Sequence, residues 1–73
     1  QVNKNKIADC LNTICTHYFL SEEDFAIFFF TSYYTIMLTG EEIFITHNRE
    51  VKTYQSIEDA IYFIREHLKY NNI

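Results

Sequence analysis

The chain has no proline, no tryptophan and one glycine among its 73 residues. A glycine-rich phosphate loop needs several glycines, so the single Gly40 excludes that class of nucleotide site. Lysine and arginine are also scarce, since six of them stand against ten acidic residues and give a formal net charge of −4. We therefore do not expect binding of duplex nucleic acid through phosphate contacts. With 48% hydrophobic residues, the lack of proline and glycine also excludes a disordered linker.

Cysteine is scarce as well, with Cys10 and Cys15 as the two thiols of the chain. Both fall in a segment that we predict to be helical, where their side chains diverge by roughly 140° and cannot form a strain-free disulfide. We expect two buried or half-buried thiols in a reducing compartment. Cys10 and His17 would lie about 10.5 Å apart on that helix, too far for one metal ion, so we predict no metal site and no cofactor.

Targeting and membrane signals are absent from the pattern. No basic segment followed by an apolar run opens the chain, so we expect no signal peptide. The longest uncharged apolar stretch, residues 25–38, is shorter than the roughly 18 residues that a membrane span needs. The sequence therefore predicts a soluble cytoplasmic protein.

Apolar side chains recur at helical spacing near the start of the chain. Residues 4–20 place Ile7, Leu11, Ile14 and Cys15 on one side, which predicts an amphipathic helix with Cys15 in the core.

A second helix is predicted over residues 57–70. Ser56 stands at the N-cap position, and Asp59 follows three residues later as in a capping box. Asn71 and Asn72 are expected to end the helix. Its apolar stripe is Ile57, Ala60, Ile61, Ile64 and Leu68.

The residues between the helices are rich in aromatic and β-branched side chains, which favours strands. We predict strands at about residues 25–38, 41–47 and 51–55. A two-residue hairpin loop at Thr39-Gly40 would need positive φ at Gly40 and would pair Leu38 with Glu41. A three-residue turn is expected at Asn48-Arg49-Glu50. Residues 25–30 are either the first half of a long strand or a separate strand that turns at Thr31-Ser32.

Together these elements predict a single small α+β domain over residues 1–73. The expected order is α-β-β-β-α, with four strands if residues 25–30 form a strand of their own. The strands form an antiparallel meander, and both helices pack on one face of it.

Charge is distributed unevenly, because residues 21–59 hold eight acidic and two basic side chains. Such charges commonly solvate the loops between apolar strands. The functional alternative is an acidic surface that meets a basic partner.

The sheet face away from the helices is the candidate binding surface. A contiguous aromatic patch usually marks an interaction surface, and tyrosine and methionine are enriched at interfaces. The alternative is that residues 25–30, or one helix, fold over this face and bury it. The predicted register places on this face, with Lys52 among them, the candidate protein-binding residues Tyr33, Met37, Phe44 and Tyr54.

These features favour a non-catalytic, small acidic protein-binding or regulatory module rather than an enzyme. We expect it to bind a second copy of itself, or another protein, through the aromatic face or through an apolar edge strand at residues 25–30. The alternative is an acidic inhibitor or nucleic-acid-mimicking accessory protein of a phage or mobile element, since the composition is typical of AT-rich microbial genomes. A single-stranded nucleic-acid binder is disfavoured because the strand region offers only Arg49 and Lys52 for phosphates.

Overall fold

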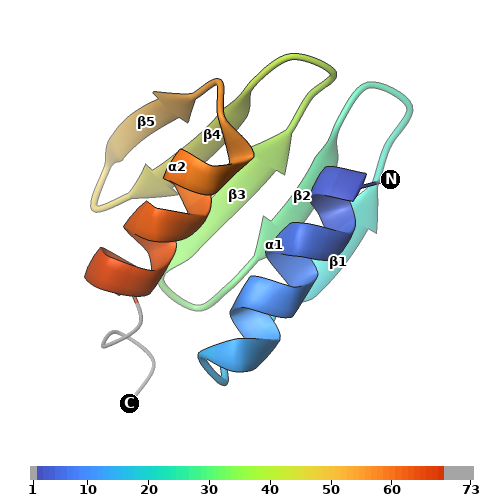
Figure 1. Ribbon diagram of the computed structural model, residues 1–73. Helices are drawn as coiled ribbons and strands as arrows, with labels where there is room; N and C mark the ends of the chain where they lie inside the picture. The colour runs from blue at the N-terminus through green and yellow to red at the C-terminus, as the bar shows by residue number, and fades with distance from the viewer. Residues whose placement is uncertain (1, 69–73) are drawn as a thin grey trace.

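In a computed structural model, which describes residues 2–68, two helices cover one face of a five-stranded antiparallel sheet (Figure 1). The predicted α+β class and meander are confirmed, but the sheet has five strands rather than three or four. The elements are α1 (Val2–Thr13), β1 (Phe19–Glu22), β2 (Ile27–Phe30), β3 (Tyr34–Leu38), β4 (Ile43–His47), β5 (Glu50–Tyr54), α2 (Ile57–Phe63) and the π-helical turn η1 (Ile64–Leu68).

The strands neighbour one another in sequence order, so β1 and β5 are the edges of the sheet. Residues 25–30 do not form an edge, because β2 pairs with β1 on one side and with β3 on the other. The expectation of an apolar edge strand there was wrong. One of the actual edges, β5, carries Glu50 and Lys52, and charges of this kind discourage pairing with another chain.

The first helix is shorter than predicted. It ends at Thr13 rather than at residue 20, and Phe19 and Leu20 belong to β1. Ile7 and Leu11 are buried as expected, but Cys15 is exposed beyond the helix, which corrects its placement in the core.

A Schellman motif accounts for the early end of α1. Thr16 N–H donates to the Leu11 carbonyl at 2.8 Å, and Cys15 N–H donates to the Asn12 carbonyl at 3.1 Å. These two bonds satisfy carbonyls at the helix end and place Cys15 at φ 58. Glycine is the usual residue in this conformation, so the sequence carried no ordinary stop signal.

The β3–β4 hairpin has a longer loop than predicted. Leu38 pairs with Ile43, so residues 39–42 form the loop. The Thr39 hydroxyl accepts hydrogen bonds from the N–H groups of Glu41 at 3.3 Å and Glu42 at 3.0 Å, which holds the four residues together. Gly40 does not have positive φ, so the predicted two-residue turn was wrong.

The β4–β5 hairpin has a shorter loop than predicted. Asn48 and Arg49 both have positive φ, at 53° and 67°, and form a two-residue turn of the kind that matches strand twist. A one-residue change in register moves every side chain to the other face. Lys52 and Tyr54 therefore lie on the helix side of the sheet, opposite to their predicted placement.

The core lies between the helices and the covered face of the sheet. Ser56 caps α2 as predicted, since its hydroxyl accepts from Asp59 N–H at 3.5 Å. The predicted end of this helix near residue 70, with Asn71 and Asn72, lies outside the described residues. The most completely buried large side chains are Phe29, Ile7, Leu11, Ile36, Ile45, Ile64 and Leu68.

Candidate protein-binding face

The sheet presents an uncharged face on the side away from the helices. Residues paired across antiparallel strands point to the same side, so the register defines two rows on this face. One row follows Phe19, Phe30, Thr35, Thr46 and Val51, and the other follows Ser21, Phe28, Met37, Phe44 and Thr53. We call these ten residues the open face.

Four phenylalanines form a connected cluster at one side of the open face. Phe28 stacks on Phe30 with 5.6 Å between ring centroids and an interplanar angle of 8°. Phe19 lies 6.4 Å from Phe30, and Phe25, from the β1–β2 loop, lies 6.4 Å from Phe28. These separations are typical of interacting aromatic rings. We call Phe19, Phe25, Phe28 and Phe30 the phenylalanine cluster.

Much of this apolar surface is exposed. The exposed fraction is 68% for Phe19, 74% for Phe25, 41% for Phe30 and 62% for Val51. Single exposed apolar residues are ordinary, whereas a contiguous group marks an interaction surface. The face is therefore neither covered by a helix nor solvated by charges.

The four predicted binding residues separate into two groups. Met37 and Phe44 are paired partners on the open face and are half-buried by their neighbours. Tyr33 is exposed in the β2–β3 turn. Tyr54 lies on the helix side, where its ring is 5.9 Å from Phe63, and burial together with the Asp59 carboxylate raises its pKa.

The phenylalanines of β1 and β2 were not predicted to lie on the open face. Phe19 was assigned to the first helix. Residues 25–30 were predicted as strand and as a possible apolar edge, but Phe28 and Phe30 were not assigned to a face of the sheet. The available signal was a turn after Phe30, at residues 31–33. Such a turn makes residues 27–30 a separate strand, in which side chains alternate between the two faces. Pairing with β3 then places Phe28 and Phe30 on the same face as Met37 and Thr35.

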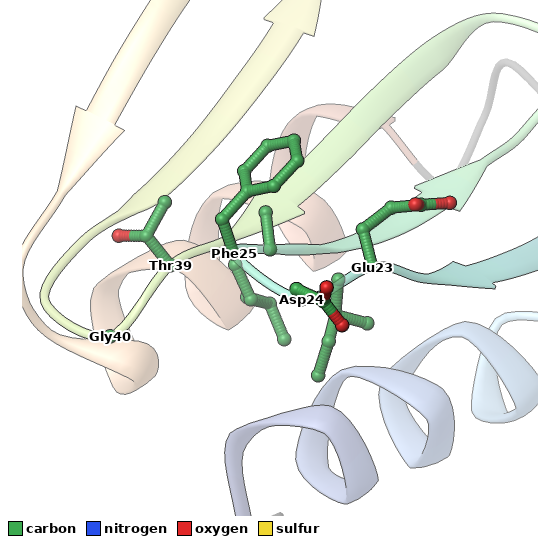
Figure 2. Close-up of a pocket in the computed structure, with 8 residues that line it drawn as sticks. Glu23, Asp24, Phe25, Thr39 and Gly40 are labelled. Carbon is green, nitrogen blue, oxygen red and sulfur yellow. The ribbon is translucent and has the colours of Figure 1, made fainter.

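Acidic side chains gather at one end of the sheet. The β1–β2 loop supplies Glu23 and Asp24, and the β3–β4 loop at the same end supplies Glu41 and Glu42. A shallow cavity of about 250 Å³ lies between these loops, lined in part by Glu23, Asp24 and Phe25 (Figure 2). The Phe25 ring points away from α1 in this view. We call Glu23, Asp24, Glu41 and Glu42 the acid end.

The helix layer is a different kind of surface. Lys6 Nζ lies 3.5 Å from Glu58 Oε2, within a groove of mixed charge between α1 and α2 that also borders the exposed Tyr62. On the buried side of α1, burial raises the pKa of the Cys10 thiol, and Arg65 acts in the opposite direction. Cys10 is thus a buried, protonated thiol.

Comparison with known proteins gives no assignment. No protein-family model, curated protein or solved structure matches the chain. Within residues 2–68, no three His, Cys, Asp or Glu side chains are grouped so as to hold a metal ion. None of the helices in that range has the length and apolar character that a membrane crossing requires.

Proposed function

We propose that this chain is a non-catalytic protein-binding module that acts as a homodimer through its open face. The observation that carries the proposal is the open face itself, which is uncharged, rich in phenylalanine and left uncovered by both helices (Figure 1). Such a face favours association with another apolar surface because burial removes its side chains from water.

The size of the face sets the expected strength of the dimer. Strand spacing near 4.8 Å and a rise near 3.4 Å per residue give a five-stranded face a projected area of about 400 Å². Two such faces bury on the order of 800 Å², below the roughly 1,200 Å² at which stable interfaces begin. The expected dimer is therefore weak and exchanging, with a dissociation constant on the order of micromolar or higher.

An acidic partner-binding role is the second candidate, and the acid end favours it. Four carboxylates on two neighbouring loops present one sign of charge to an approaching molecule. The chain would then act as an acidic accessory protein or inhibitor that binds a basic protein surface. Single-stranded nucleic acid is not favoured, since phosphates need cations and the open face carries none.

Light scattering on matched variants tests the proposal. Phe30→Glu places a charge on the open face, and Tyr62→Glu places one on a more exposed aromatic position of α2. The wild type and Tyr62→Glu are expected to approach the dimer mass at high micromolar concentration, whereas folded Phe30→Glu stays monomeric. Circular dichroism checks that both variants are folded. A wild type that remains monomeric, or a Phe30→Glu variant that still dimerises, would contradict the proposal.

A further inference from the structure

The open face differs from one edge of the sheet to the other. The phenylalanine cluster occupies the β1–β2 side, with ring contacts that run from Phe25 to Phe19. The β4–β5 side carries the smaller Thr46, Val51 and Thr53 beside Phe44. The strongest apolar contact is therefore off centre.

The face also differs from one end of the strands to the other. The acid end lies where β1 and β3 finish. The opposite end carries the β2–β3 turn and the Asn48-Arg49 turn, with Arg49 exposed. One end of the face is thus bordered by four carboxylates, and the other by the Arg49 guanidinium, with the exposed Glu50 beside it on the helix side of β5.

A face-to-face homodimer has two aligned arrangements. Packed sheets keep their strands within about 30° of each other, and a two-fold axis makes both copies use the same surface. An axis across the strands sets β1 over β1 of the second copy with the strands antiparallel. An axis along the strands sets β1 over β5 of the second copy with the strands parallel.

The two asymmetries favour the same arrangement. In the parallel arrangement, the acid ends would meet each other, and like charges at an interface oppose association. The phenylalanine cluster would also face Thr46, Val51 and Thr53 of the second copy. In the antiparallel arrangement the two clusters face each other, and Arg49 approaches the β3–β4 loop of the second copy, which carries Glu41 and Glu42.

We infer that the dimer is antiparallel, with phenylalanine cluster packed on phenylalanine cluster and the acid ends at opposite ends of the interface. This inference rests on the proposed homodimer and adds its geometry. It predicts that β1 lies over β1 of the second copy, and β5 over β5.

Cysteine crosslinking tests the arrangement. Ser21 on β1 and Thr53 on β5 both belong to the open face. β1 and β5 are about 19 Å apart within one sheet, whereas two packed sheets lie about 10 Å apart. A short bismaleimide therefore links cysteines that face each other across the interface, but not cysteines on opposite edges, and this distinguishes the arrangements. The background is Cys15→Gly, which removes the exposed thiol, while Cys10 is 2% exposed and unreactive.

The expected result is dimer formation by Ser21→Cys alone and by Thr53→Cys alone. When the two variants are mixed, no crosslink is expected between Ser21→Cys and Thr53→Cys, because the antiparallel arrangement keeps β1 away from β5 of the second copy. Crosslinking that occurs only in the mixture would establish the parallel arrangement and overturn the inference while leaving the homodimer standing. A wild type that sediments as a monomer would overturn the homodimer itself. Dimers that crosslink in none of these samples would place the contact elsewhere. That result would overturn both the antiparallel arrangement and dimerisation through the open face.

Discussion

Replacement of Cys15 by glycine is expected to stabilise the fold. Cys15 follows α1 at φ 58, and this left-handed conformation costs a residue with a Cβ about 1–2 kcal/mol. Glycine adds conformational freedom to the unfolded chain, which offsets about 0.4–1 kcal/mol of that gain. The side chain is exposed, so its removal leaves no cavity. The net expectation for Cys15→Gly is a gain of about 0.5–1 kcal/mol in the free energy of unfolding.

Urea denaturation under reducing conditions measures this gain, and a thermal melt should show a midpoint about 2–8 °C higher. Cys15→Ala is the matched control, because it removes the thiol but keeps the Cβ that the conformation disfavours. We expect it to stay within about 0.5 kcal/mol of the wild type. If Cys15→Gly is no more stable than Cys15→Ala, the Schellman account of how α1 ends is refuted.

Other single changes test the loops and the core. Gly40→Ala should be neutral or stabilise by up to about 1 kcal/mol, because Gly40 lacks positive φ and a Cβ would meet no atom within 4 Å; a clear loss in urea denaturation would contradict this. Thr39→Val should cost about 0.5–1.5 kcal/mol, since it removes the hydroxyl that accepts from the solvent-accessible amides of Glu41 and Glu42; an unchanged midpoint would refute that role. Ile64→Ala should cost about 2–5 kcal/mol because Ile64 is fully buried, and Ile61→Ala, at a half-buried position, should cost less. A larger loss for Ile61→Ala than for Ile64→Ala would show that another face of the helix packs against the sheet. Ser56→Ala should cost about 1 kcal/mol through loss of the α2 cap, and a loss below about 0.3 kcal/mol would argue against it.

The parts of the fold that follow from local rules were predictable. Ser56 and the apolar stripe after it identified α2, because capping and helical spacing act within a few residues. The inside–outside separation of β3 and β4 also held, although the loop at Gly40 was assigned the wrong length. That error shifted the pairing by an even number of residues, and an even shift leaves each side chain on its own face.

The wrong predictions occur where a single residue determines the register of a strand or the end of a helix. The β4–β5 turn is one residue shorter than predicted, so Tyr54 lies on the helix side rather than on the open face. Cys15 ends α1 in a conformation that sequence patterns reserve for glycine, and this hid β1 with Phe19. The candidate site was therefore partly predictable. Met37 and Phe44 were placed on the open face, whereas residues 25–30 were expected to bind through an edge and Phe19 was assigned to the first helix.

The methyl group of Met37 offers the most direct test of self-association through the open face. Met37 is the single methionine of the chain and lies in the central strand of that face, so a ¹³C-methyl-methionine label gives one signal at the proposed contact. The proposal predicts that this signal shifts or broadens as the protein is concentrated from low to high micromolar, and that Phe30→Glu abolishes the change. A Met37 signal that stays constant over this range while light scattering reports a dimer, or a change that persists in Phe30→Glu, would contradict it.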